Sequence, residues 1–304
     1  MAETRLPQDL ALAAAARAER ARGARVAWSL LAASPTTLLG LGLVLLLILT
    51  ALLAPFIAPY PDDATKPVLH IRDRLKPPSW AHPFGTDELG KDILSRVVFG
   101  ARVTIEIVLR VVGLAMLIGV PLGAMAGFLG GWVSTVLLRL TDVFLALPGL
   151  VLSIAIVMLL GPSLSHAMLA LALVWWPGYA RLTQGQVLSL KQEGFVEAAR
   201  CVGVSPSRII FDHILRNAVT PLIVKASLDM GYAILAAAGL GYIGLGAQPP
   251  TPEWGVMISK GRNYLADQWW YTVFPGLAIF LSVLGFNLLG DGFRDMLDPN
   301  AHGR

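Results

Sequence analysis

Two glycine-rich stretches have the spacing of phosphate-binding motifs. Residues 85–91 match a P-loop in spacing, but Asp92 stands where a Ser or Thr would hold Mg²⁺. The neighbouring acids Asp87 and Glu88 would also repel phosphate, and no strand precedes the stretch, as a P-loop requires. The sequence therefore predicts no nucleotide site in residues 85–91.

The second stretch has the GxGxxG pattern of dinucleotide sites, formed by Gly239, Gly241 and Gly244. That pattern needs a strand before it, a helix after it and an acid about 20 residues further on. Here a long apolar run, which predicts a helix, precedes the glycines, and two consecutive prolines follow them. We therefore reject dinucleotide binding.

Residues that could hold a metal ion or act as a nucleophile are scattered along the chain. The five histidines are His70, His82, His166, His213 and His302, and no metal-ligand spacing joins them. Cys201 is the only cysteine, which excludes an internal disulfide and a cysteine-based metal cluster, and we expect it to be a small apolar packing residue. We find no catalytic constellation and expect neither a cofactor nor a metal in this chain.

Two pairs of opposite charges lie four residues apart within apolar runs. Glu106 and Arg110 form the first pair, and Lys225 and Asp229 form the second. Residues four apart share one face of a helix, so each pair can neutralise its own charges. Because charged groups inside a membrane are suspected of function by default, Glu106 and Arg110 are also a possible substrate-path pair.

The most informative stretch is the polar segment 192–221, which lies between two apolar runs. Its first half predicts a short amphipathic helix, because apolar residues recur at helical spacing while charged residues fall on other faces. The apolar residues are Phe195, Val196, Ala199 and Val202, and the charged ones are Glu197 and Arg200. Gly203 then supplies a left-handed helix stop. Ser205 before Pro206 predicts the N-cap of a second helix.

This second helix should run toward Asn217, so the segment is predicted to be a helix-turn-helix on the membrane surface. Two interpretations remain. The segment either docks a partner protein through an apolar ridge or is an ordinary solvated loop between two membrane helices.

The elements that must position these residues are membrane helices. Of the 304 residues, 55% are hydrophobic and only 14% are charged, whereas soluble domains have about 25% charged residues. We therefore predict an all-α integral membrane protein without a globular domain. The formal net charge of +4 comes from scattered bases, so nucleic-acid binding has no support.

Apolar runs of about 20 residues can cross a bilayer core, and they predict about six transmembrane helices. The expected spans are residues 36–58, 103–128, about 142–160, 166–182, 222–245 and 272–289. The last five belong to a core over residues 102–291. In the second span Gly119, Gly123, Gly127 and Gly131 repeat every fourth residue, and such a stripe lets another helix approach closely.

The distribution of Lys and Arg predicts the orientation. Arginines outnumber acids in the N-terminal segment 1–35, whereas charges balance in the proline-rich loop 59–101. The positive-inside rule therefore places both termini, including the tail 292–304, in the cytoplasm and the loop 59–101 outside. With six crossings the polar segment 192–221 lies on the cytoplasmic side too.

Several stretches resemble permease subunits of binding-protein-dependent ABC importers, in particular those of the di- and oligopeptide branch. Glu197-Ala198-Ala199, then Gly203 after three residues and Ile214-Leu215 further on, is similar to the EAA loop of that family. Similarity to the peptide branch also covers HPFGTDELGKDILSRVVFGAR, GLGYIGLGAQPPTPEWG and the tail GDGFRDMLDPNAHGR. Arg216 stands where the family usually has proline, so we expect Pro221 to supply the bend into the next helix.

The resemblance implies the C-type subunit of a peptide importer, with an ABC type I importer permease fold, in the plasma (inner) membrane. It implies that the EAA loop, with Phe195 and Arg200 beside it, forms a coupling helix that docks into a groove of a cytoplasmic ATPase. The implied partners are a homologous permease in a heterodimer, one or two ABC ATPase subunits that bind the ATP and Mg²⁺, an extracytoplasmic substrate-binding protein, and membrane lipid. The chain is then the pore-forming subunit for di- or oligopeptides and not an enzyme.

Other functions are also open. Nickel complexes and other small solutes are alternative cargoes, because relatives of this family carry them. An ion-coupled secondary transporter is an alternative class, but such proteins usually carry midplane acids or internal repeats, and we expect neither here. A membrane scaffold fits the glycine stripe equally well but gives the polar segment no role.

Overall fold

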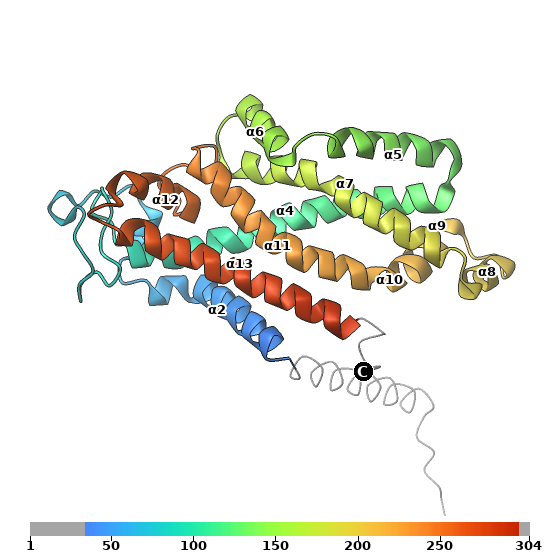
Figure 1. Cartoon of the computed structure of the whole chain (residues 1–304), viewed down its shortest axis with the longest axis horizontal. Coiled ribbons are helices and arrows are strands. Elements are labelled where there is room, and N and C mark those ends of the chain that lie inside the picture. Colours follow the sequence, from blue (N-terminus) through green and yellow to red (C-terminus); the bar gives the residue numbers. More distant parts are fainter. Residues whose placement is uncertain (1–33, 298–304) are drawn as a thin grey trace, which may run out of the picture.

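The computed structural model describes residues 34–297 as a bundle of helices elongated in one direction (Figure 1). Residues 1–33 of the N-terminal segment and residues 298–304 of the tail lie outside this range. The described part contains no strand, only an isolated bridge between Thr86 and Asp92. The all-α prediction is confirmed.

Within residues 34–297, four helices are long and apolar enough to cross a membrane. They are α2 (Pro35–Ile57), α4 (Ile93–Leu129), α11 (Val219–Tyr242) and α13 (Trp270–Leu297), and they correspond to the first, second, fifth and sixth expected spans. α7 (Leu164–Leu190) corresponds to the fourth. Its 27 residues reach about 40 Å, enough for a bilayer core, although it is less apolar than the other four.

The third expected span is broken. α5 (Gly131–Leu145) and α6 (Gly149–Leu160) are bent by 88° at residues 146–148, and together they make either a fifth apolar crossing or a re-entrant loop. Pro148 stands at the break, and the residue before a proline is disfavoured in helical conformation. The prediction of one straight span over residues 142–160 is therefore wrong in shape.

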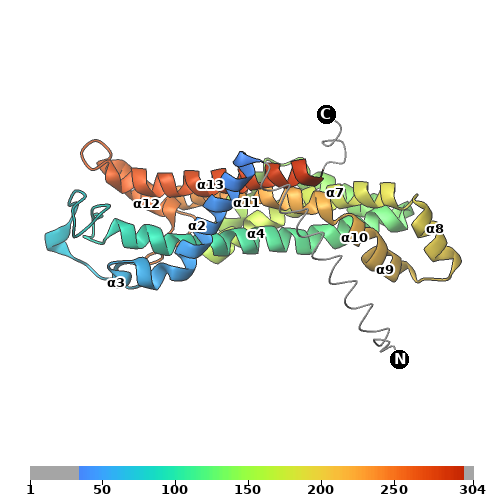
Figure 2. The same cartoon turned by 90° about the horizontal axis from the view of Figure 1, so that it is seen from below.

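α4 is the central helix of the bundle (Figures 1 and 2). α7 packs along it, α2 packs on another side, and α11 and α13 contact each other beside it. Val108 and Val111 of α4, Leu171 of α7 and Leu240 of α11 are among the largest fully buried side chains. An apolar core along α4 therefore holds these helices together.

The two predicted extramembrane segments lie at opposite ends of the bundle. The loop after α2, which contains α3 (Pro61–Thr65) and the 3-10 turn η1 (Ile71–Asp73), lies at the left in Figure 1, next to α12 (Trp254–Gly261). α8 (Gly194–Cys201) and α9 (Pro206–Arg208) lie at the right. The expected topology places the loop 59–101 outside the cell and the segment 192–221 in the cytoplasm, so it requires the two segments to lie at opposite ends.

The loop between α2 and α4 is shorter than the predicted range 59–101, because α4 begins at Ile93. Asp92 caps this helix: its side chain accepts a hydrogen bond of 2.7 Å from the backbone N–H of Ser95. The apolar run alone predicts a helix that starts near residue 103. The helix in fact begins ten residues earlier, which is nearly three turns, at its polar cap.

Buried carboxylates make this loop a compact cap on the bundle. The Asp63 carboxylate accepts a hydrogen bond of 2.7 Å from the backbone N–H of Asp92, and Asp87 pairs with Arg96 of α4. Burial raises the pKa of Asp87, although the nearby Arg96 acts in the opposite direction. Long-range pairs of this kind order a loop that its prolines suggested to be irregular.

α12 was not predicted. It starts behind Glu253, whose carboxylate accepts hydrogen bonds from the backbone N–H groups of Gly255 at 2.7 Å and Val256 at 2.8 Å. The Trp254 indole N–H donates to the Val97 carbonyl at 3.0 Å and ties α12 to α4. Because Glu253 is buried, its pKa is raised to about 7.

Candidate functional site

The docking loop, residues 192–221, starts with α8 and turns at Gly203. Gly203 has a φ of +79°, the left-handed conformation expected for the helix stop. Its N–H donates to the carbonyl of Arg200, and the N–H of Val204 donates to the carbonyl of Ala199, each at 3.0 Å. This pair of bonds is a Schellman motif, which satisfies the last carbonyl groups of α8. The predicted stop is confirmed.

The second half of the docking loop is helical from Pro206 to Asn217, as predicted. It consists of α9, a π-helical segment η2 (Ile209–Ile214) and α10 (Leu215–Asn217). Ser205 occupies the predicted N-cap position, but its side chain makes no capping hydrogen bond. The proline at the first helical position therefore starts this helix without help from the serine hydroxyl.

Arg216, at the position where the family usually has proline, lies within α10. The helix is interrupted at Ala218, with φ of −87° and ψ of −2°, and α11 begins at the next residue. Pro221 lies in the first turn of α11. The break lies in the turn that precedes Pro221, where the missing N–H and the ring of a proline disturb the helix, so it agrees with the expectation that this proline supplies the bend.

The apolar residues of α8 do not form a single ridge. Val196 and Ala199 are buried, in a cluster with residues of η2, α4 and α7. Phe195 and Val202 are 40% and 79% exposed. Phe211 of η2, which the sequence pattern missed, is 61% exposed. Because η2 has π-helical hydrogen bonding, a period of 3.6 residues does not predict which of its side chains points outward.

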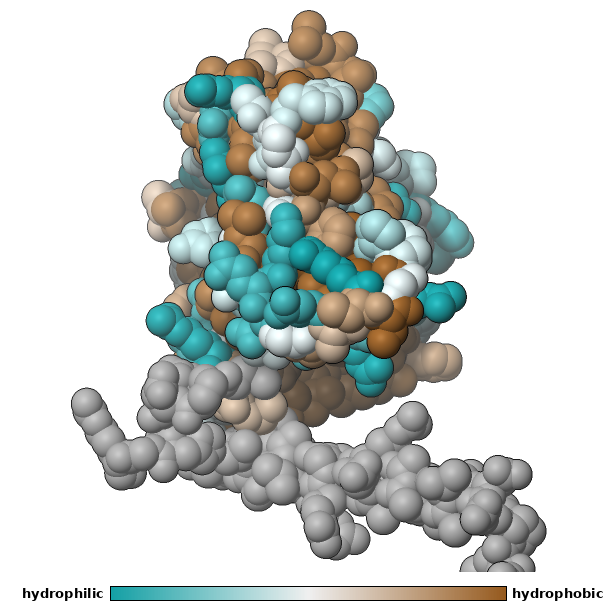
Figure 3. Space-filling model, turned by 90° about the vertical axis from the view of Figure 1, so that its right-hand side faces the viewer, coloured by the Kyte–Doolittle hydropathy of each residue, from teal (hydrophilic) through white to brown (hydrophobic). Residues whose placement is uncertain are grey.

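The polar side chains fix the docking loop to the bundle. Glu197, Ala198 and Arg200 are exposed, and the Arg200 guanidinium carbon lies 5.5 Å from the centre of the Phe128 ring at the end of α4. Lys191 Nζ lies 5.6 Å from the same ring and donates to the Phe128 carbonyl at 2.7 Å. Figure 3 views this end of the molecule, where hydrophobic patches lie among hydrophilic residues. Such a mixed surface suits contact with a protein.

The close helix contact predicted from the glycine stripe is made between α4 and α7. A Cβ atom at Gly123 would lie 2.2 Å from the Ala180 carbonyl oxygen, and Cβ atoms at Gly119 and Gly127 would lie 2.3 and 2.8 Å from the nearest atoms of α7. Gly131 does not belong to this contact, because a Cβ atom there would meet no atom within 4 Å. Its φ of +55° instead serves the turn into α5.

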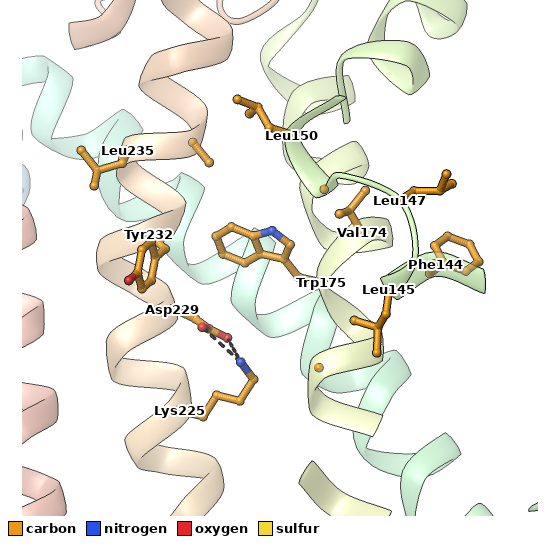
Figure 4. A pocket seen from close by; sticks show the side chains of 13 residues that line it. Phe144, Leu145, Leu147, Leu150, Val174, Trp175, Lys225, Asp229, Tyr232 and Leu235 are labelled. Atoms are coloured by element: carbon orange, nitrogen blue, oxygen red, sulfur yellow. Dashed lines mark hydrogen bonds and ion pairs between the residues drawn. The ribbon is translucent and has the colours of Figure 1, made fainter. Parts of the chain in front are cut away.

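A second candidate site is a cavity of about 680 Å³ between α7, α11 and the bend that joins α5 to α6 (Figure 4). Its lining is mainly apolar and aromatic, with Trp175 from α7 and Tyr232 from α11 facing inward. Trp176, the neighbour of Trp175, is instead buried against the Phe144 ring at 5.5 Å.

Lys225 and Asp229 are the charged groups that line this cavity within the described part of the chain. They form the expected pair, with Lys225 Nζ 3.0 and 3.3 Å from the two carboxylate oxygens. Lys225 Nζ also lies 4.9 Å from the centre of the Tyr179 ring. Asp229 is near the middle of α11, so the expectation that no acid sits mid-span is wrong.

The other expected pair also forms, with Arg110 2.9 Å from Glu106. Both side chains are about half exposed, and neither lines the cavity. A role in the substrate path therefore stays a prediction for them. An ion pair that the sequence did not reveal joins Asp142 of α5 to Arg181 of α7.

Within residues 34–297 no three His, Cys, Asp or Glu side chains are grouped as metal ligands would be. His70 and His82 each lie 3.0 Å from a carboxylate, of Asp63 and Asp92 respectively, in the cap at the left of Figure 1. Cys201 is exposed, so the packing role expected for it is wrong.

Two models of known protein families match different parts of the chain. The family model described as the binding-protein-dependent transport system inner membrane component matches residues 119–303. The model for the N-terminal TM domain of oligopeptide transport permease C matches residues 24–78. Each match includes helices of the described residues 34–297.

Three relatives match most of the chain. The probable D,D-dipeptide transport system permease protein of Escherichia coli is 48% identical over 285 residues, which is 94% of either chain. The dipeptide transport system permease protein of Alkalihalophilus pseudofirmus is 44% identical over 90% of this chain and 89% of its own. The glutathione transport system permease protein of Pectobacterium atrosepticum is 43% identical over 84% of either chain.

Proposed function

The chain belongs to the family of inner membrane components of binding-protein-dependent transport systems, and we propose that it is the permease subunit of an ABC importer for di- or oligopeptides. It is a multi-pass inner-membrane protein with the ABC type I permease fold. Three similar proteins are named for D,D-dipeptide, dipeptide and glutathione transport, which supports a peptide as the cargo.

The docking loop is the contact for the ATPase that powers this importer. The observation that carries the assignment is a pair of short helices that project from one end of an apolar bundle with Phe195, Val202 and Phe211 exposed. An apolar side chain at a polar end gains nothing from lipid, but it gains from burial against a protein. Gly203 and the bonds around it hold the two helices at a fixed angle, as a mechanical contact needs.

A fixed loop can transmit motion. Arg200 fastens α8 to Phe128, and Lys191 fastens the end of α7 to the same residue. The glycines of α4 bring that helix into close contact with α7. When the ATPases close on ATP, they push the docking loop, and α4 and α7 move with it as one body. The docking loop, α4 and α7 thus form the part of this chain that moves, and the partner ATPase binds ATP and Mg²⁺.

The remaining partners follow from the same assignment. A homologous permease completes a heterodimer, and α5 and α6 offer it a surface, because Thr141 is the one buried residue of α5. An extracytoplasmic substrate-binding protein delivers the peptide to the opposite end, which is formed by the cap and α12. The termini and the docking loop are then cytoplasmic.

Cys201 provides a test of this orientation. It is the only cysteine of the chain and is exposed on α8. A membrane-impermeant thiol reagent should label it in inside-out vesicles and leave it unlabelled in intact spheroplasts. Bound ATPase should slow the labelling in the vesicles. Labelling from the outside alone would overturn the assignment of the docking loop.

The energy source separates this function from the ion-coupled alternative. Cells that express the complete importer should lose dipeptide uptake when ATP is depleted and an ion gradient is kept. The purified complex should contain an ATPase that leaves it when the docking loop is disrupted. Uptake that persists without ATP, or a complex without any ATPase, would contradict the proposal.

A further inference from the structure

The cavity between α7, α11 and the α5–α6 bend is lined by two charged side chains as well as by apolar ones. We infer that Lys225 and Asp229 form a recognition site for the two charged termini of a short peptide, an inference that rests on the proposed function. Lys225 binds the carboxylate of the peptide, and Asp229 binds its ammonium group. Between transport cycles the two side chains neutralise each other, as they do in this structure.

The position of the pair supports this role. Both side chains extend into the cavity, on the side across from Trp175 (Figure 4). They are partly open to it, with 31% of the Lys225 side chain and 15% of the Asp229 side chain exposed. Ionised groups within a membrane helix are costly and mark substrate pathways more often than they mark packing.

The two terminal charges of a peptide allow Lys225 and Asp229 to exchange each other for the cargo as ion-pair partners. A peptide with free termini brings one positive and one negative group, so one ion pair within the protein is replaced by two ion pairs with the cargo. No charge is then left without a partner in an environment of low dielectric constant, which is the condition under which buried charges are tolerated. A peptide with blocked termini offers no such exchange.

The spacing also fits a short peptide. Four residues of α11 rise about 6 Å along the helix axis, and an extended dipeptide spans about 7 Å. The Lys225 side chain is guided by α7: a Cβ atom at Gly178 would be 3.4 Å from Lys225 Cε, and the ammonium group faces the Tyr179 ring. Lys225 is therefore held at the edge of the cavity, and its backbone lies about one helical turn from that of Asp229.

The rest of the cavity suits side chains of many kinds. Its volume lies within the range of about 300–1,000 Å³ that is common for small-molecule sites. Trp175, Tyr232, Leu150 and Val174 give it aromatic and apolar walls without further charges among the described residues. The site therefore selects for free termini and tolerates different side chains. Because the termini carry the same charges in either chirality, this recognition does not depend on the handedness of the residues.

Transport by the complete importer tests the role of the two charges. K225M/D229L removes both charges together, so it leaves no unpaired charge that would impair insertion. We expect about tenfold lower dipeptide uptake, because two charge-assisted contacts with the cargo are lost. K225R/D229E keeps both charges and should retain uptake. D62N/K66Q removes an exposed pair of the same spacing in the cap and serves as a control.

A labelling experiment detects the peptide itself. In the purified complex carrying C201S and Y232C, the single remaining cysteine of this subunit reports on the cavity. Alanyl-alanine at millimolar concentration should slow its reaction with a thiol reagent, and N-acetyl-alanyl-alanine amide should not. The protection should disappear when K225M/D229L is added. No protection by alanyl-alanine, or equal protection by the blocked peptide, would overturn the inference.

Separate readouts distinguish failure of this inference from failure of the proposed function. Each variant is also assayed for bound ATPase and for ATP hydrolysis stimulated by the binding protein, which the cavity charges should not affect. If the wild-type complex transports peptide with ATP and K225M/D229L does so equally well, the recognition site alone is refuted. If the wild-type complex contains no ATPase, the proposed function fails whatever the cavity does.

Discussion

Arg200 of α8 lies over the ring of Phe128, the penultimate residue of α4, with 5.5 Å between the guanidinium carbon and the ring centre. Lys191, nine residues earlier in the chain, lies at a similar distance from that ring, so two cations contact one aromatic side chain. The contact joins a surface loop to the central helix of the bundle. A force on α8 therefore reaches α4 without passing through a flexible connection.

Gly203 is expected to be needed for its backbone conformation and not for its small size. A Cβ atom there would meet no atom within 4 Å, but φ is +79°. A residue with a side chain pays roughly 1–2 kcal/mol in that region, and a β-branched residue is still less suited to it. We expect G203V to lower the amount of ATPase that co-purifies by about tenfold, since about 1.4 kcal/mol corresponds to that factor.

G203N is the matched control for this change, because asparagine tolerates the left-handed region better than other residues with a side chain. It should retain ATPase close to the wild-type level. Normal ATPase binding by G203V, or equal losses in both variants, would show that the turn does not set the docking geometry.

Val202 is expected to contribute directly to the ATPase contact. It is 79% exposed at the end of α8, so an aspartate there does not disturb the fold of the free subunit. In the complex, V202D would bury a charge against an apolar groove, and we expect at least about a tenfold loss of affinity for the ATPase. V202I should bind normally. Affinity measured on purified subunits would contradict the prediction if V202D bound as tightly as V202I.

Gly123 and Gly113 lie on the same helix in opposite environments. A Cβ atom at Gly123 would lie 2.2 Å from the Ala180 carbonyl oxygen, whereas Gly113 has no neighbour within 4 Å. Over-packing of a close contact costs about 1–3 kcal/mol or more. G123L should therefore lower the melting temperature and the yield of the purified complex, while G113L should leave both unchanged. Equal behaviour of the two variants would refute the close contact.

Short-range rules sufficed for the parts of the site that depend on local geometry. Gly203 was predicted as a left-handed stop because few other residues adopt that conformation, and the structure places it there. Gly119, Gly123 and Gly127 were predicted to face another helix because of their spacing alone. In each case one residue type and one period determine the structure, so no knowledge of distant contacts is required.

Other parts depend on contacts that no local pattern encodes. Asp92 starts α4 ten residues before the predicted span, and it is held by Asp63, which is far away in the sequence. Phe211 is exposed because its helix is π-helical, and Pro148 breaks a run whose hydropathy indicates one span. Hydropathy reports how apolar a segment is, but neither its register nor its bends. The sequence thus located the docking loop and several of its exposed side chains, among them Phe195 and Val202, but not Phe211.

Glu253 should make stability depend on pH. Burial raises its pKa from 4.5 to about 7, so the folded protein binds a proton that the unfolded chain has already released between these values. Stability should therefore fall as the pH rises from about 4.5 to about 7, by roughly 3 kcal/mol, and level off above that range. E253Q cannot titrate and should flatten this slope. Melting temperatures of the purified complex at pH 5 and 7.5 would contradict the prediction if wild type and E253Q changed equally.

Phe128 should matter for coupling more than for docking. F128A removes the ring that Lys191 and Arg200 both face, while the hydrogen bonds at Gly203 remain. Two exposed cation–π contacts contribute about 1–2 kcal/mol together, which is enough to loosen α8 from α4 without unfolding the docking loop. The ATPase should stay bound and hydrolyse ATP, and the number of peptides transported per ATP should fall severalfold.

F128W keeps an aromatic face for both cations and is the matched variant. It should transport as many peptides per ATP as the wild type, because tryptophan binds cations at least as well as phenylalanine. If F128A instead released the ATPase, Phe128 would belong to the docking contact. If F128A left both the bound ATPase and the ratio unchanged, force would pass from α8 to the bundle by another route, and the buried side chains of Val196 and Ala199 would be the next contacts to test.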